Sequence, residues 1–125
     1  MTGVQTCALP ISDPLNDQAL ARHADSRGGT LFALAGRLLG AEPTVLRIAG
    51  QGWAHADLAR QLTVAALANH ASAQARAMLS QAFTATWPAP VRAVGVLALL
   101  ASLDLEGGTP LAKAWRVARF RFTGR

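Results

Sequence analysis

The hydrophobic positions of this chain recur at helical rather than strand spacing. From Asp13 onward apolar side chains return every three or four residues, and no stretch alternates apolar and polar side chains as a half-buried strand does. Glycine and proline divide this pattern into segments. The pattern predicts helices over about residues 17–39, 43–67, 72–86 and 91–103, and a last helix from residue 109 onward. We therefore expect an all-α bundle of about five helices.

Local signals predict where several of these helices begin and end. The pair Gly28–Gly29 interrupts the first segment, and Gly40 is a natural C-terminal stop for it. Pro43 stands where the first turn of a helix tolerates proline. Thr109 followed by Pro110 has the form of an N-cap and a first helical residue.

Each segment also has an apolar face that we expect to be buried. The segment at 91–103 is apolar nearly all round, which predicts a central position in the domain. The other expected core side chains are Leu31, Leu34, Ala35 and Leu38; Leu46, Ala49, Trp53 and Ala56; Leu79 and Phe83, with Met78; and Leu111, Trp115, Ala118 and Phe122.

Composition supports a folded helical chain. Apolar residues make up 51% of the 125 positions and charged residues 15%, which excludes a disordered solvating tail. The chain is rich in Ala and Leu and has no Tyr, a composition that favours helix over strand. The apolar stretch that begins at Ala93 falls far short of the ~20 residues that cross a bilayer.

The net charge of +5 is concentrated at the C-terminus. We interpret it chiefly as a solvated cationic helix end, which complements the helix dipole. Two alternatives remain. An amphipathic basic helix can rest on an anionic membrane surface, and Trp115, Phe120 and Phe122 interleave with the cations as in some nucleic-acid sites. Because Trp115 and Phe122 fit the apolar face, no nucleic acid is expected. The cations are Lys113, Arg116, Arg119, Arg121 and Arg125.

The first twelve residues differ from the rest of the chain. They have no helical periodicity and contain the one cysteine, Cys7. Residues 2–11 resemble the in-frame translation of a sequencing-library adapter, and they lack the basic and apolar regions of a signal peptide. We therefore expect residues 1–12 to be non-native and residues 13–125 to be part of a longer protein, and we argue neither disulfide nor thiol chemistry.

Candidate chemistry is sparse. His23, His55 and His70 have no metal-site spacing. The most informative stretch is residues 52–60, where Asp57 and Arg60 lie three apart on one helical face beside Trp53. This spacing favours an intrahelical ion pair, and a polar patch that lines a pocket between helices is the alternative.

Three stretches together resemble the C-terminal half of the squalene/phytoene synthase family. Residues 23–40, from His23-Ala24-Asp25 through Gly28-Gly29-Thr30-Leu31-Phe32 to Leu38-Leu39-Gly40, are similar to a family helix. Residues 50–60 are similar to the helix that carries the second aspartate-rich motif, and residues 115–125, ending Thr123-Gly124-Arg125, to the closing segment. The resemblance covers residues 20–125.

The resemblance implies a truncated isoprenoid-synthase-type helical bundle. Active members join two prenyl diphosphates head to head, with Mg²⁺ held between two aspartate-rich motifs. Here the two aspartate positions of the second motif fall on Gln61 and Ala65, and the first motif would precede this chain. We therefore expect no Mg²⁺ ligand set, no catalytic residue and no prenyltransferase activity. Trp53, Asp57 and Arg60 remain as candidates for the lining of a substrate pocket.

Other roles follow from the same resemblance. A prenyl diphosphate is the ligand expected of an intact parent protein. Family members without the aspartates include assembly factors for respiratory complex I, so a protein partner is the main alternative, and a basic-helix nucleic-acid module is a distant third. The implied location is cytoplasmic, with contact at the inner membrane surface left open. Because half a bundle would leave the apolar segment at 91–103 uncovered, we also expect self-association.

Overall fold

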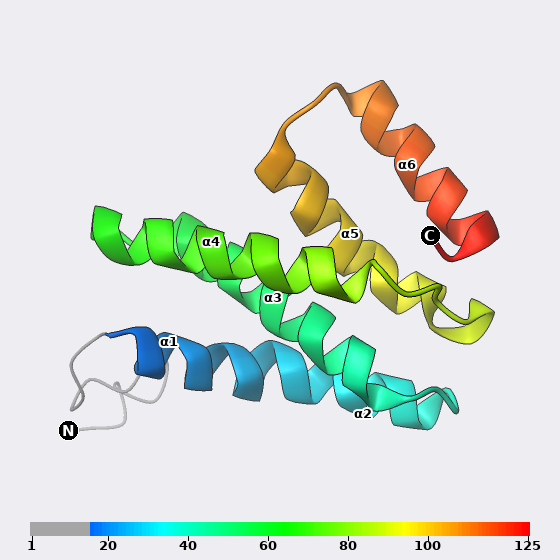
Figure 1. The fold of residues 1–125 in the computed structure, drawn as a ribbon, viewed down its shortest axis with the longest axis horizontal. Coiled ribbons are helices and arrows are strands. Elements are labelled where there is room, and N and C mark those ends of the chain that lie inside the picture. The colour runs from blue at the N-terminus through cyan, green and yellow to red at the C-terminus, as the bar shows by residue number, and fades with distance from the viewer. Residues whose placement is uncertain (1–15) are drawn as a thin grey trace.

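The structure is a computed structural model that describes residues 16–125, and all of its regular elements are helices (Figure 1). The predicted all-α class is confirmed. The segment 1–12 interpreted as non-native lies outside the described residues. In chain order the elements are α1 Asp17–Ala24, the π-helix η2 Asp25–Gly29, α2 Thr30–Leu38, α3 Pro43–Gln61, α4 Ala65–Ala82, the 3₁₀ turn η3 Ala89–Val91, α5 Arg92–Glu106 and α6 Pro110–Thr123.

The first helix continues through Gly28–Gly29, where the sequence predicted an interruption. The chain takes one π-helical turn there, and the backbone angles of its first and last residues, Asp25 and Gly29, are right-handed helical. An added Cβ at Gly28 would overlap the backbone carbonyl of Gly50 on α3. The glycine pair therefore allows close approach between this turn and α3. The π turn joins α1 and α2 into one continuous helix.

The predicted helix-end signals are confirmed at three positions. Gly40 has φ +76° and follows the last turn of α2, where the Ala41 amide donates to the Gly36 carbonyl at 2.8 Å. Pro43 opens α3. The Thr109 hydroxyl accepts from the Ala112 amide at 3.1 Å, which caps α6.

The boundary between the second and third segments was predicted wrongly. The sequence pattern placed it at residues 68–71, whereas α3 ends at Gln61 and α4 begins at Ala65. Leu62 and Val64 have extended backbones with ψ values of 132° and 114°. Thr63 and Val64 are both β-branched, which weakens the helix at this point, while the Ala-rich residues after them favour a new one.

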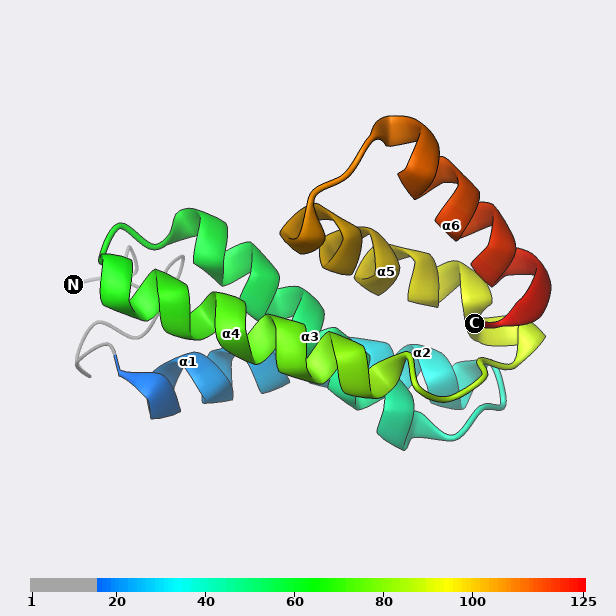
Figure 2. The ribbon, with the colours of Figure 1, turned by 45° about the horizontal axis from the view of Figure 1, so that its top comes forward.

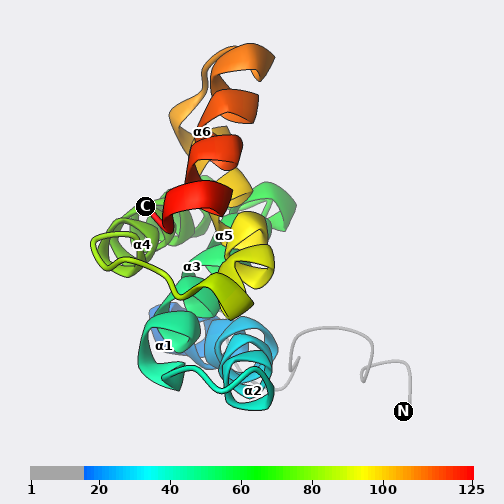
Figure 3. The same ribbon diagram turned by 90° about the vertical axis from the view of Figure 1, so that its right-hand side faces the viewer.

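Helix α3 occupies the centre of the molecule. Figure 3 shows it enclosed by α1 and α2 on one side, α4 on another and α5 on a third. The predicted face of α3 is buried at Leu46, Ala49 and Ala56, and half-buried at Trp53. The prediction that residues 91–103 form the central helix is wrong, because Leu97 of α5 is 52% exposed. The small residues of α3 allow other helices to approach it on several sides. Helix α3, rather than α5, is therefore the central helix, and it contacts α1, α2, α4 and α5.

Two predicted core faces point to solvent. On α2, Leu31, Leu34 and Leu38 are exposed, and Phe32 is buried instead. Close contact with α3 selects the face of α2 that contains Phe32, Ala33 and Gly36, since small residues let the two helices approach. On α6 the exposed side chains are Leu111, Trp115, Ala118 and Phe122.

An aromatic cluster explains the orientation of α6. Phe120 is fully buried and packs edge-on against Phe83 and Trp87, with ring centroids 5.4 and 5.7 Å away. Gly95 on α5 leaves room for it, because an added Cβ there would come within 2.7 Å of the Phe120 ring. The Trp87 indole nitrogen donates to the Ala82 carbonyl at 3.1 Å. This cluster turns Phe120 inward and the predicted apolar face of α6 outward.

Helices α5 and α6 form a hairpin whose end is fastened to the preceding loop (Figure 2). The Arg92 guanidinium donates to the Trp87 carbonyl at 2.9 Å and to the carbonyls of Arg121 and Phe122 at 3.2 and 3.1 Å. The Trp87 amide donates to the Gly124 carbonyl at 2.8 Å. These bonds satisfy carbonyls at the C-terminal end of α6 that no helical amide can reach.

Candidate functional site

The structure joins two of the three predicted site residues in an ion pair. Asp57 Oδ1 accepts from Arg60 Nη2 at 2.9 Å, and Asp57 Oδ2 accepts from Gln61 Nε2 at 2.7 Å. The Asp57 side chain is 23% exposed and the Arg60 side chain 71%. All three residues belong to the last turns of α3, so this is the intrahelical pair that the spacing favoured. Such exposed pairs contribute only a few tenths of a kcal/mol.

Trp53 lies near this pair but faces a different environment. Its ring packs against Phe32 with centroids 5.7 Å apart. Trp53 and Arg60 line a pocket of about 180 Å³ between α3, α4 and α5, to which Asp57 does not contribute. Burial is the largest cause that lowers the pKa of His23 on α1, Arg27 adds to the lowering, and the charge of Asp57 opposes it. The structure therefore does not bring the three candidates together around one cavity.

The small pocket contains a carboxylate that sequence reasoning missed. Asp104 of α5 lines it, and Asp104 Oδ1 accepts from Lys113 Nζ at 2.9 Å. Asp104 is 44 residues from Arg60 in the sequence, so no local spacing could have indicated this proximity. The pocket lining therefore contains one cation, Arg60, and one carboxylate, Asp104.

The arrangement does not fit a Mg²⁺ site of the kind the resemblance implies. Magnesium prefers an octahedron of oxygen ligands and keeps them in strict geometry. Both oxygens of Asp57 already accept hydrogen bonds from their own helix. Gln61 ends α3 and Ala65 opens α4, so the two positions do not lie on consecutive turns of one helix. Within residues 16–125 no three His, Cys, Asp or Glu side chains gather closely enough to hold a metal ion.

A second polar cluster lies at the π turn and was also missed. Asp25 Oδ1 accepts from Arg47 Nη1 at 2.9 Å and from Gln51 Nε2 at 2.8 Å, both one turn apart on α3. The Gln51 hydrogen bond, followed by the contributions of Arg47, lowers the pKa of Asp25. These bonds fasten η2 to α3 beside the Gly28–Gly50 contact, so the cluster has a structural role.

His55 is the one buried polar side chain among the described residues. Its Nδ1 lies 2.9 Å from the Gln51 carbonyl, one turn earlier on α3. Burial is the largest cause that lowers the pKa of His55, the Gln51 bond opposes it, and the charge of His70 on α4 adds to the lowering. A neutral imidazole that donates to Gln51 satisfies this position.

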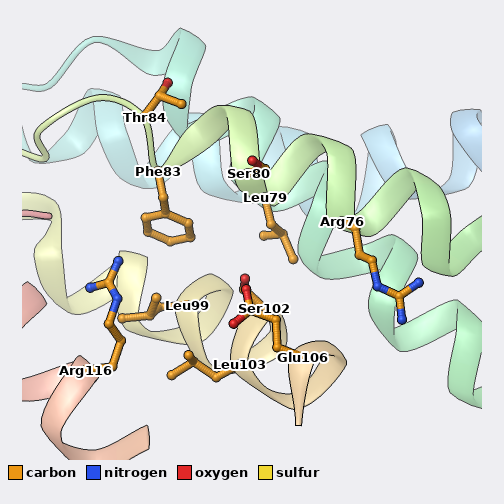
Figure 4. Close-up of a pocket in the computed structure, with 10 residues that line it drawn as sticks. All are labelled: Arg76, Leu79, Ser80, Phe83, Thr84, Leu99, Ser102, Leu103, Glu106 and Arg116. Atoms are coloured by element: carbon orange, nitrogen blue, oxygen red, sulfur yellow. The ribbon is translucent and has the colours of Figure 1, made fainter. Parts of the chain in front are cut away.

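A second cavity, of about 480 Å³, lies between α4 and the α5–α6 hairpin (Figure 4). Leu79, Phe83 and Leu99 form its apolar wall. Arg116 reaches its rim from α6 and Glu106 from α5, and burial lowers the pKa of Arg116. Arg116 Nη1 donates to the Arg125 carbonyl at 2.6 Å, which holds the side chain at the C-terminal end of α6. The cavity has the form of an amphipathic cleft rather than an acid–base site.

Comparison with known protein families, curated proteins and solved structures finds no match to this chain. None of the described helices is both long enough and apolar enough to cross a membrane.

Proposed function

We propose that residues 13–125 are the C-terminal part of a squalene/phytoene synthase-like protein and that this chain does not catalyse prenyl transfer. The three similar stretches support the family, and the all-helical fold agrees with it. The second stretch, residues 50–60, lies within α3, and the resemblance implies that this helix carried the second aspartate-rich motif.

The observation that carries the non-catalytic part of the proposal is the hydrogen bonding of the Asp57 carboxylate. Both of its carboxylate oxygens accept hydrogen bonds, from Arg60 and from Gln61. A diphosphate leaves as an anion, and active family members neutralise it with Mg²⁺ held by several carboxylates. Asp57 belongs to no group of three or more metal-ligating side chains within residues 16–125, and one carboxylate already hydrogen-bonded within its own helix does not supply the several that this step needs.

Calorimetric titration of farnesyl and geranylgeranyl diphosphate tests this proposal. Each ligand is titrated with and without Mg²⁺, at low and at high salt, into the chain and into its Asp57→Ala variant. We expect no binding that requires Mg²⁺ and no condensation product. Saturable binding that needs Mg²⁺, survives high salt and disappears in Asp57→Ala would contradict the proposal.

The genomic sequence upstream of Asp13 tests the family assignment separately. An aspartate-rich motif about half a domain upstream would support the family and return catalysis to the intact parent. Related helical sequence without such a motif would support a non-catalytic parent.

The second candidate is a non-enzymatic interaction factor of the same fold, such as an assembly factor for respiratory complex I. The observation that favours it is the apolar row on α2, where Leu31, Leu34 and Leu38 are exposed. Contiguous exposed apolar surface commonly marks a protein interface. In a strain that lacks its own assembly factor, this candidate predicts complementation by the chain and by Asp57→Ala, but not by a Leu31→Gln, Leu34→Gln, Leu38→Gln variant.

A further inference from the structure

One face of α6 is apolar and open to solvent. Leu111, Trp115 and Phe122 are 81%, 72% and 84% exposed. Their spacings of four and seven residues put them on one line along the helix, with the exposed Ala118 between them. We call these four residues the α6 stripe. Two large aromatic side chains held in water on one helix face call for an explanation, because single exposed apolar residues are common but a row of them is not.

The fold fixes the direction of the α6 stripe. Phe120 is buried against Trp87 on the opposite side of the helix. Arg92 binds the last carbonyls of α6, at Arg121 and Phe122. Rotation of α6 to bury its stripe would withdraw Phe120 from the core and break these bonds. Figures 1 and 3 place α6 at the outer edge of the molecule, beyond α5, so the stripe is also accessible.

Cations flank the α6 stripe on both sides. At 100° per residue, Arg119 and Arg121 project to opposite sides of the line through Leu111 and Phe122, and both are exposed. Among the described residues neither guanidinium is paired with a carboxylate. No acidic residue follows Glu106 in the chain, whereas five cations do.

We propose that α6 binds the surface of an anionic lipid bilayer. The helix lies parallel to the surface, its stripe enters the boundary between headgroups and acyl chains, and Arg119 and Arg121 contact lipid phosphates. Trp and Phe suit this boundary, and arginine reaches the phosphates while its stem stays among apolar groups. This inference stands on α6 alone and is independent of the proposed loss of catalysis.

The charge pattern favours a bilayer over two other occupants. A second copy docked stripe to stripe would bring the arginines of both copies together with no carboxylate between them. A single-stranded nucleic acid would need aromatic faces interleaved with cations, whereas the α6 stripe is a continuous apolar line with the cations at its margins. An anionic bilayer offers an apolar interior for the stripe and phosphates for the arginines at its margins.

Vesicle binding tests the proposal. The full chain is mixed with phosphatidylcholine vesicles and with vesicles that also contain phosphatidylglycerol. We expect co-sedimentation with the anionic vesicles, little with the neutral ones, and loss of binding as ionic strength rises from about 0.1 M to about 1 M, where the Debye length falls from ~10 Å to ~3 Å. Trp115 is the most exposed of the three tryptophans, so its fluorescence should shift to the blue on binding, and Trp115→Phe should remove most of that shift while binding persists.

Matched variants separate the α6 stripe from exposed apolar surface in general. Replacing Leu111, Trp115 and Phe122 by serine should lower the partition into anionic vesicles roughly tenfold or more. The control replaces Leu31, Leu34 and Leu38 by serine, three exposed apolar residues on α2, and should bind as the parent chain does.

A second pair of variants tests the charges. Arg119→Gln with Arg121→Gln should weaken binding by roughly fivefold per cation, since each cation near an anionic surface contributes about 1 kcal/mol. The control is Arg22→Gln with Arg37→Gln, which removes two cations on α1 and α2 and should leave vesicle binding unchanged. Circular dichroism verifies that each variant is folded.

Three results would overturn the proposal. One is equal binding to neutral and anionic vesicles. Another is unchanged vesicle binding by the folded stripe variant. The third is sedimentation of a dimer that the stripe variant abolishes, or oligonucleotide binding that Arg119→Gln with Arg121→Gln abolishes, either of them without vesicle binding by the parent chain.

Discussion

Gly28 and Gly50 bring the π turn and α3 into backbone contact. An added Cβ on either glycine would overlap the backbone of the other, and at Gly50 it would also press on the Cβ of Phe32. The contact places Asp25 where Arg47 and Gln51 can both reach it. One pair of glycines thus determines how the first helix crosses the central one.

The first prediction concerns this crossing. Gly28→Ala should lower the free energy of unfolding by about 2–3 kcal/mol, because rigid backbone cannot move aside for the new methyl group. Gly36→Ala is the control, since the nearest atom there is a Leu46 methyl 3.1 Å away at the end of a flexible side chain. Its effect should stay within about 1 kcal/mol, as helix propensity offsets the crowding. Urea denaturation measures both, and equal losses would show that the glycine contact is not the cause.

Local features of this fold were predictable from the sequence, and long-range ones were not. Gly40 and Thr109 act on their own helix ends, so their residue types were enough to place those ends. The Asp57–Arg60 pair is also local, because residues three apart share a helix face. By contrast, Asp25 and Arg47 are 22 residues apart, and only the Gly28–Gly50 contact brings them together.

The choice of buried face shows the same limit. On α6 the stripe with Leu111 and Trp115 has the regular apolar spacing, yet Phe120 is the residue in the core. The deciding contact is the room that Gly95 leaves beside Trp87, on a different helix. A pattern within one helix cannot reveal that room, so periodicity identified the helix correctly and its buried face wrongly.

The second prediction concerns pH. Burial lowers the pKa of His55 below its ordinary value of 6.5. The unfolded chain therefore binds this proton more readily, and the free energy of unfolding should decrease as the pH falls below about 6.5. Urea denaturation at a series of pH values between 7.5 and 5 measures the slope.

Variants assign that slope to residues. His55→Gln should reduce it, and the double variant His23→Gln, His55→Gln should nearly remove it, because burial lowers the pKa of His23 as well. Stability that rises as the pH falls through this window would contradict the assignment. Carboxylates such as Asp25 affect the free energy of unfolding only at lower pH, since hydrogen bonds lower the pKa of that side chain.

The third prediction concerns the fastening of α6. Arg92→Met removes the hydrogen bonds to the carbonyls of Trp87, Arg121 and Phe122, and should cost about 1–3 kcal/mol. Hydrogen exchange should accelerate in α6 and stay slow in α3. Arg60→Met is the control, because its exposed pair with Asp57 contributes little. Equal acceleration in α3 and α6 would mean that Arg92 supports the whole fold rather than this helix.

The fourth prediction concerns self-association. Leu97 and Leu100 of α5 are 52% and 39% exposed, in line with the uncovered apolar surface expected for this helix. The chain should form dimers or larger species at micromolar concentration and bind a hydrophobic dye. Leu97→Gln with Leu100→Gln should shift sedimentation toward monomer and reduce dye binding. A monomeric parent chain that binds no dye would refute this expectation.

The central claim is that the Asp57 carboxylate is hydrogen-bonded within its own helix and does not hold a divalent ion. Paramagnetic broadening of amide NMR signals by Mn²⁺, in the presence of farnesyl diphosphate, tests this most directly, because Mn²⁺ takes the same oxygen ligands as Mg²⁺. We predict no selective broadening of the signals of residues 53–61 by Mn²⁺, and the same extent of broadening in the parent chain and in Asp57→Asn. Selective broadening around Asp57 and Gln61 that disappears in Asp57→Asn would contradict the account.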